Sequence, residues 1–161
     1  TFIRTSDNYN FISAYDDIFK EVGAAWGIDW VLLAAIARSE SEFRSDAISS
    51  SGAVGLMQLM PDTFNWLCTL TRENHDTGML YDPATNLRLG TAYLSWLYQR
   101  YGVWETVFAA FDAGTEAVDA WLANPEYVSE LGTLTSIPDP STARFVKEVA
   151  KAREIYIKLY F

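Results

Sequence analysis

The stretch SEFRSDAISSSGAVGLMQLMP spans residues 41–61 and directly follows Glu40. Its first half is rich in serine and glycine, small residues that let a ligand or another segment approach the backbone closely. Its second half, GLMQLMP, is apolar and rich in methionine, with at most a minor strand at residues 54–60. The apolar run WVLLAAIA precedes the stretch at residues 30–37. Glu40 therefore stands where an apolar helix gives way to irregular structure.

Glu40 is predicted to face the protein interior. Leu33, Ile36, Glu40 and Phe43 follow one another at spacings of three or four residues, which places them on one helix face. A carboxyl group among such apolar neighbours has its charged form disfavoured, so we expect its pKa to rise. Such a group can donate a proton near neutral pH, as a general acid for glycosidic cleavage must. The alternative is a structural glutamate that accepts hydrogen bonds from backbone N–H groups of the following loop.

The composition is that of a globular protein. The chain has 161 residues, of which 50% are hydrophobic and 15% are aromatic, enough for one domain with a sizeable core. The aromatic residues are expected mainly in that core, with some lining a groove for flat ligands such as sugars. The net charge of −9 argues against nucleic acid and against anionic membrane surfaces as partners. Cys68 is the only cysteine, so no internal disulfide can form, and we expect a small buried residue there.

The apolar periodicity predicts an all-α fold in a single domain over residues 1–161. Asp29, Asp62 and Asp82 are predicted N-caps, and Gly102 and Gly114 are predicted to separate helices. Residues 124–140 form the one long irregular stretch. We expect helices at residues 11–22, 30–43, 63–70, 83–101, 104–111, 115–123 and from 141 onward.

No run of apolar residues is long enough to cross a membrane, and no export signal is visible. Because the chain begins with threonine, we interpret it as a piece processed or excised from a larger or exported parent.

Several motifs resemble those of the soluble lytic transglycosylases, which have a lysozyme-like catalytic domain related to goose-type lysozyme. The resemblance extends from about Tyr15 to Tyr160, and it implies a lysozyme-like α-helical fold. The motifs are ESEF at 40–43, AISSSGA at 47–53, GLMQLMP at 55–61, YDPATNLRLGTAYLSWL at 81–97, AAFDAG at 109–114 and IPDPSTARFVKEV at 137–149.

The resemblance implies cleavage of the MurNAc–GlcNAc β-1,4 bond of peptidoglycan outside the cytoplasm. Glu40 would protonate the leaving oxygen and then act as a base on the C6 hydroxyl of the same MurNAc, which attacks the anomeric carbon. The product is a 1,6-anhydro sugar, so a single carboxylate suffices where ordinary glycosidases need two. The implied partner is a peptidoglycan strand, and we expect no metal or other cofactor.

The same match implies that Ser49, Met57 and Gln58 contact the substrate and that Ser41 supports the site. Met57 can pack softly against a sugar ring, and Gln58 offers both a donor and an acceptor. Because neither Met57 nor Gln58 fits a core stripe, we expect little loss of fold when either becomes alanine.

Three residues of the implied substrate site depart from the family pattern. Phe111 and Phe145 stand where the family has tyrosine, and Asp112 stands where it has asparagine. Both phenylalanines lack a hydroxyl able to bond the catalytic carboxyl. If they lie near Glu40, Phe111 and Asp112 should both raise its pKa, by apolar surroundings and by like charge.

Two other functions stay open on the sequence. A hydrolytic muramidase would use water, with Asp112 as its second carboxylate, and a peptidoglycan-binding module would release no product. His75 stands alone in ENHDTG, so we interpret it as a solvated loop residue, not a triad member or metal ligand.

Overall fold

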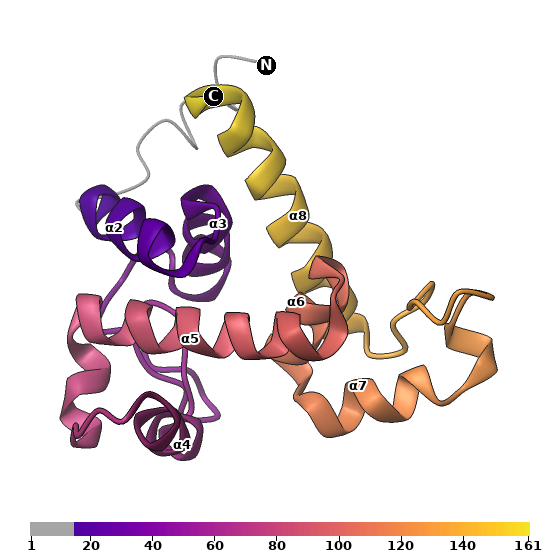
Figure 1. The fold of residues 1–161 in the computed structure, drawn as a ribbon, viewed down its shortest axis with the longest axis horizontal. Coiled ribbons are helices and arrows are strands. Elements are labelled where there is room, and N and C mark those ends of the chain that lie inside the picture. The colour runs from indigo at the N-terminus through magenta and orange to yellow at the C-terminus, as the bar shows by residue number, and fades with distance from the viewer. Residues whose placement is uncertain (1–14) are drawn as a thin grey trace. The chain divides into compact units, whose positions relative to one another are not determined.

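The computed structural model describes residues 15–161, and these residues form an all-α fold, which confirms the predicted class (Figure 1). Within them, β structure is confined to three isolated bridges. The elements are α2 (Asp16–Trp26), α3 (Trp30–Ser41), α4 (Pro61–Thr71), η1 (Thr77–Tyr81), α5 (Pro83–Tyr101), α6 (Trp104–Ala113), α7 (Thr115–Leu122), η2 (Pro125–Tyr127) and α8 (Pro140–Tyr160).

The chain groups into two compact units. The first contains the described residues up to Tyr93 together with Ala152–Phe161, and the second contains Leu94–Lys151. Helices α5 and α8 contribute residues to both units. Glu40 and the stretch that follows it belong to the first unit. A single domain over residues 1–161 stays a prediction.

Two of the three predicted N-caps are confirmed. Asp29 accepts a hydrogen bond from Val31 N at 3.2 Å and so caps α3. Asp82 accepts bonds from the N–H and the hydroxyl of Thr85, just before Pro83 opens α5. The prediction for Asp62 is wrong, because α4 already begins at Pro61 and Asp62 lies in its first turn. Its negative charge still favours that end of the helix dipole.

Helix α2 is longer than predicted at its C-terminal end. It continues past Val22 to Trp26 and ends where Gly27 adopts a left-handed conformation with φ of 64°. Glycine accepts this conformation without a steric penalty, which is why helices so often end there. The predicted start at residues 11–14 lies outside the described residues.

Helix α3 ends at Ser41, two residues earlier than predicted. Glu42 is left-handed with φ of 52°, and Phe43 follows with φ of 63°. Phe43 therefore leaves the helix face that it was predicted to share with Glu40. Its ring packs edge-on against Phe19 at a centroid distance of 6.0 Å.

Residues 47–60 form a compact loop where the sequence allowed a minor strand. Val54 pairs with Ile48 on one side and with Leu59 on the other, each time in an isolated bridge. Residues 55–58 make a tight turn, which Gln58 N closes by donating to Gly55 O at 3.1 Å. Leu56 and Leu59 are buried, so the loop forms part of the core.

No helix among the described residues has both the length and the apolar content needed to cross a membrane.

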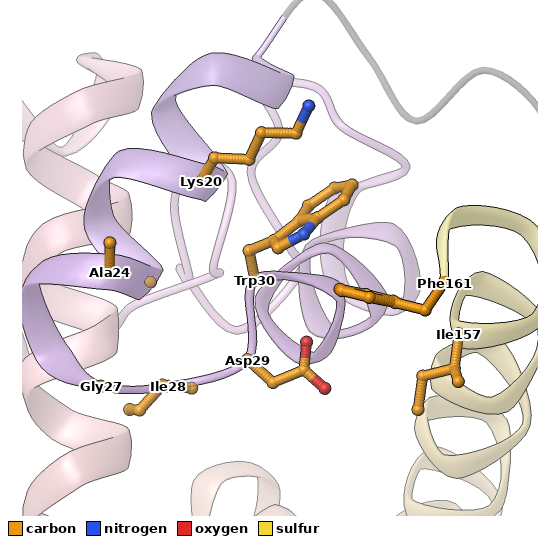
Figure 2. Close-up of a pocket in the computed structure, with 9 residues that line it drawn as sticks. Lys20, Ala24, Gly27, Ile28, Asp29, Trp30, Ile157 and Phe161 are labelled. Carbon is orange, nitrogen blue, oxygen red and sulfur yellow. The ribbon is translucent and has the colours of Figure 1, made fainter.

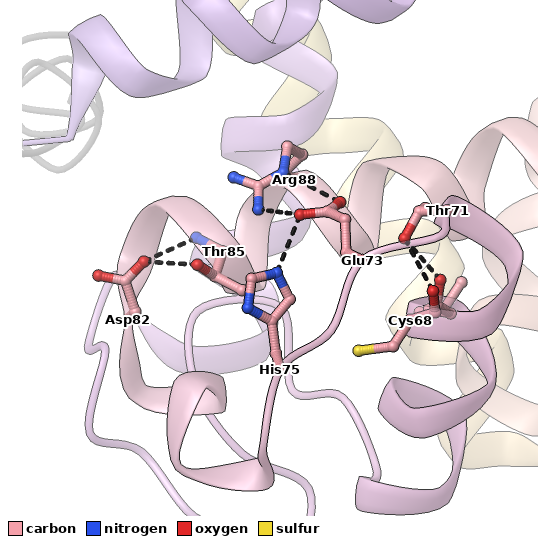
Figure 3. A network of polar contacts seen from close by, with 8 residues as sticks. Cys68, Thr71, Glu73, His75, Asp82, Thr85 and Arg88 are labelled. Atoms are coloured by element: carbon pink, nitrogen blue, oxygen red, sulfur yellow. Dashed lines mark hydrogen bonds and ion pairs between the residues drawn. The ribbon is translucent and has the colours of Figure 1, made fainter.

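A polar network joins the segment after α4 to the start of α5 (Figure 3). Arg88 donates to both carboxylate oxygens of Glu73, with Nε 3.3 Å from Oε2. His75 Nε2 lies 2.9 Å from Glu73 Oε1. His75 is therefore half-buried and paired, which corrects its interpretation as a solvated loop residue. The hydrogen bond from Arg88 is the main reason why the pKa of Glu73 falls from 4.5 to about 2.

We predict that Glu73→Gln removes a pH-dependent part of the stability. A lowered folded-state pKa stabilises the fold fully above about pH 5, and this contribution disappears as the pH falls toward about 2. The free energy of unfolding, measured by urea titration from pH 7 to pH 3, should therefore differ between parent and variant by an amount that shrinks with acidity. Glu21→Gln, at an exposed glutamate of α2, is the control and should show no such trend. A parent–variant difference independent of pH would contradict the assignment.

Candidate active site

Glu40 lies in the last turn of α3 and is half-buried. Leu33 and Ile36, which precede it on the predicted face, are fully buried. The carboxyl group of Glu40 therefore lies at the edge of the core, near the end of α3. A group in this position is sheltered from bulk water and can still be reached by a ligand.

Ser41 connects the helix end to the following loop. Its side chain is buried, and its hydroxyl lies 3.0 Å from Ala37 O and 2.9 Å from Leu56 O. Leu56 belongs to the turn at residues 55–58. The residue adjacent to Glu40 thus bonds directly to the GLMQ motif, and the supporting role of Ser41 stays a prediction.

Gln58 has a left-handed backbone, with φ of 51°, and is half-buried. Its Nε2 donates to Ala47 O and to Gly55 O, both at 3.0 Å. The amide donors that the sequence assigned to a sugar are therefore engaged inside the loop. Its Oε1 accepts no hydrogen bond from the described residues, so the acceptor is the group that Gln58 can offer to a ligand.

Met57 is fully buried, and its side chain packs over Gly90 of α5. A Cβ atom added at Gly90 would lie 2.9 Å from Met57 Cγ, so the glycine makes room for the methionine. The expectation that Met57 lies outside the core is wrong. The apolar periodicity missed it because Met57 lies in a turn and not in a helix.

Ser49 closes a small turn before this motif. Its hydroxyl accepts a hydrogen bond from Ala53 N at 3.0 Å and lies 3.0 Å from the hydroxyl of Ser51. Gly52 completes the turn with φ of 95°. Ser49 is half-buried, and its contact with a substrate stays a prediction.

Asn86 is a site residue that the sequence reasoning did not single out. It is fully buried in α5, its Oδ1 accepts from Met57 N at 2.8 Å, and its Nδ2 donates to Val54 O and Leu80 O, each at 2.9 Å. A signal was present, because Asn86 lies four residues before Gly90 and so shares the face of α5 that Gly90 opens.

The three residues that depart from the family pattern lie in the second unit. Phe111 and Asp112 come from the last turn of α6, and Phe145 comes from α8. Both phenylalanines are half-buried, and Asp112 is exposed with Oδ2 accepting from Thr142 Oγ1 at 2.7 Å. Their proximity to Glu40 and its effect on the pKa of that residue stay predictions.

A pocket of about 600 Å³ lies in the first unit between α2, the start of α3 and the end of α8 (Figure 2). Its charged groups are already engaged. Lys20 Nζ lies 5.1 Å above the ring of Trp30, and Asp29 caps α3 and pairs with Arg153 at 3.2 Å. The pocket lies at the opposite end of α3 from Glu40, about 15 Å along the helix at 1.5 Å per residue. Both carboxylate oxygens of Asp29, which lines this pocket, are bound, and we place the candidate active site at Glu40.

The residues around Glu40 can support proton transfer by one carboxyl group. Among the described residues, no cluster of three or more histidine, cysteine, aspartate or glutamate side chains is placed to hold a metal ion.

Comparison with known proteins identifies relatives over most of the chain. The transglycosylase SLT domain family matches residues 17–130. The soluble lytic murein transglycosylase of Escherichia coli K12 is 36% identical over 144 residues, which are 86% of this chain and 22% of that protein. A putative soluble lytic murein transglycosylase of Haemophilus influenzae is 33% identical over 154 residues, 91% of this chain and 25% of that protein. The chain thus spans about a quarter of the length of these relatives.

Solved structures give the same picture. An inactive glutamate-to-glutamine mutant of the lytic transglycosylase Slt from Pseudomonas aeruginosa matches with a TM-score of 0.81 and 32% identity, over 90% of this chain and 24% of that one. The 70 kDa soluble lytic transglycosylase of Escherichia coli matches with a TM-score of 0.81 and 34% identity, over the same shares. A 70 kDa soluble lytic transglycosylase in complex with bulgecin A also matches, with a TM-score of 0.81 and 34% identity.

We predict that Met57→Ala lowers the free energy of unfolding by about 2–5 kcal/mol, as expected for a buried methionine truncated in a packed core. Met60→Ala is the matched control, because Met60 is 41% exposed and its truncation should cost about 0.5 kcal/mol or less. Urea or thermal denaturation of both variants measures the difference. Equal stability losses would contradict the core assignment of Met57.

Proposed function

The chain belongs to the transglycosylase SLT domain family, and from this premise we propose that it is the catalytic domain of a peptidoglycan lytic transglycosylase. Its fold is the helical, lysozyme-like fold of its solved relatives. The proposed substrate is a peptidoglycan glycan strand, since relatives that match most of the chain are named for acting on murein. The proposed place of action is outside the cytoplasm, where that polymer lies.

The observation that carries the proposal is the position of Glu40. It follows seven consecutive fully buried residues, at positions 31–37, and is itself half-buried. Partial burial disfavours the charged carboxylate and so helps a glutamate to hold the proton that a general acid must deliver. The Pseudomonas relative is described as inactive when one glutamate is replaced by glutamine, which supports a requirement for one carboxyl group.

In the proposed reaction Glu40 acts first as an acid and then as a base. Its proton passes to the oxygen of the MurNAc–GlcNAc bond as the bond from the anomeric carbon to that oxygen breaks. The resulting carboxylate then takes the proton of the C6 hydroxyl of the same MurNAc, and the C6 oxygen bonds to the anomeric carbon. Glu40 ends protonated as it began, and no water is consumed. The substrate supplies the nucleophile, so a second carboxylate at a fixed separation is not needed.

The loop residues after Glu40 have separate roles in this proposal. Gln58 Oε1 accepts a hydrogen bond from a sugar hydroxyl or acetamide N–H, because its Nε2 is engaged within the loop. Ser49, which is half-buried, contacts the strand through its hydroxyl. Met57 contributes through the turn that it anchors, since its side chain is buried. In the second unit, Phe111, Asp112 and Phe145 are proposed as further substrate contacts.

The first experiment identifies the product. We predict that purified glycan strands incubated with the protein yield 1,6-anhydro ends, which weigh one water less than reducing ends in mass spectrometry. Reducing ends alone would support a hydrolytic muramidase with Asp112 as its second carboxylate. Binding without release of either product would support a peptidoglycan-binding module. Either result would overturn the transglycosylase proposal.

The second experiment tests the acid. Glu40→Gln preserves the size and most hydrogen bonding of the side chain but removes the transferable proton, so activity on purified glycan should fall at least about a hundredfold. The control is Glu42→Gln, which makes the same change at an exposed carboxyl two residues away and should leave the rate unchanged. Circular dichroism should report the same fold for both variants. Near-normal turnover by Glu40→Gln would exclude Glu40 as the acid.

A further inference from the structure

One peptide group in the GLMQ turn is held at both of its ends by side chains. The carbonyl oxygen of Leu56 lies 2.9 Å from Ser41 Oγ, and the N–H of Met57 donates to Asn86 Oδ1 at 2.8 Å. These two backbone groups belong to the same peptide unit, which is planar and rigid. Ser41 comes from α3, next to Glu40, and Asn86 comes from α5. The peptide unit is therefore fixed between two helices.

The orientation of the Asn86 amide is determined by its partners. Its Nδ2 donates to the carbonyl oxygens of Val54 and Leu80, so the opposite atom must be the oxygen that accepts from Met57 N. The side chain is fully buried, with both of its N–H donors in use. Asn86 therefore has no freedom to turn without leaving buried backbone groups unpaired, which is costly.

Two glycines make this arrangement possible. A Cβ atom added at Gly55 would lie 2.2 Å from Asn86 Nδ2, and one added at Gly90 would lie 2.9 Å from Met57 Cγ. Gly90 lies four residues after Asn86, so both are on one face of α5. On that face, the amide of Asn86 bonds the backbone of Met57, and Gly90 leaves room for the side chain of Met57.

We propose that Asn86 is a positioning residue for catalysis, acting with Ser41 through the Leu56–Met57 peptide. This peptide sets the direction in which the chain enters Gln58, whose backbone is held in the left-handed region at φ 51°. The carbonyl end of the same peptide is bonded to Ser41, the residue after Glu40. We call Ser41, Asn86 and the peptide between them the clamp. The clamp fixes the distance between Glu40, the acid, and Gln58, the proposed sugar contact. This inference rests on the proposed function of Glu40 and Gln58.

The size of the expected effect follows from how sharply catalysis depends on placement. Rotation of the Leu56–Met57 peptide would displace Gln58, because Gln58 follows directly on Met57. A misplacement of about 1 Å can cost about a hundredfold in rate. Loss of one end of the clamp should therefore lower kcat/KM more than it lowers stability.

Ser41→Ala is the main test, because it removes one end of the clamp and leaves Asn86 in place. Thr91→Val is the matched control: Thr91 is a buried residue of α5 whose Oγ1 bonds Leu87 O at 2.7 Å, the same four-residue spacing as the Ser41–Ala37 bond. Both changes delete a buried hydroxyl, but only Ser41 also reaches the GLMQ turn. At a temperature where both variants are folded, Ser41→Ala should lower kcat/KM about tenfold or more through displacement of Gln58. Thr91→Val should stay within about twofold of the parent.

Asn86→Ala tests the other end of the clamp. It leaves Met57 N–H without its acceptor, so the amide of Met57 should exchange with solvent faster by NMR, and kcat/KM should fall as in Ser41→Ala. The double variant should lose less activity than the product of the two single losses, because both act on one peptide. If Asn86→Ala does not fold, the exchange rate of the Met57 amide in Ser41→Ala decides the proposal. Faster exchange than in Thr91→Val supports the clamp, and equal exchange overturns it.

The outcomes separate the clamp from the function on which it rests. Activity of a folded Ser41→Ala equal to that of Thr91→Val, or a loss that only follows the unfolded fraction, would overturn the clamp. If the parent itself forms no anhydro ends, the proposed function fails, and a glycan-binding measurement replaces kinetics. In that case a tetramer of N-acetylglucosamine should bind Ser41→Ala more weakly than Thr91→Val, and equal affinity would overturn the positioning role.

Discussion

The first unit depends on how a loop without regular structure satisfies its backbone polar groups inside the core. Buried N–H and C=O groups must be paired, and residues 54–58 have neither a helix nor a sheet to pair with. The amide of Asn86 pairs with two of these groups, the carbonyl of Val54 and the N–H of Met57, and also with the carbonyl of Leu80. The absence of side chains at Gly55 and Gly90 lets this contact form. The loop can therefore be both a part of the core and a wall of the candidate site.

Local chemistry predicted the helices well and the loop poorly. Asp29, Asp82 and Gly102 act over a few residues, so a sequence reader can place the helix ends that they produce. Met57 and Gln58 depend on partners outside any periodic pattern. The bond from Met57 N reaches Asn86, 29 residues away, and Gln58 Nε2 reaches Ala47, 11 residues away. The burial of Met57 and the internal use of the Gln58 donors could not be predicted without those partners.

The candidate site was predicted in the same uneven way. The spacing of Leu33, Ile36 and Glu40 indicated an inward carboxyl, and the helix places Glu40 half-buried after a buried run. The remainder came from motifs, which name residue types but do not fix their contacts. A reaction in which the substrate supplies the nucleophile needs little from the protein beyond one protonated carboxyl and a rigid surface beside it. An apolar helix end joined to a hydrogen-bonded loop meets both requirements.

The reach of these bonds along the sequence also determines how much of the chain must be folded for the site to be complete. Ser41 meets Leu56 across 15 residues, and Met57 meets Asn86 across 29. Closing such loops costs chain entropy that a tight turn alone cannot recover. The turn at residues 55–58 is therefore held in place only where α3 and α5 are packed together. Glu40 is carried by its own helix, whereas the surface beside the acid is complete only when both helices are in place.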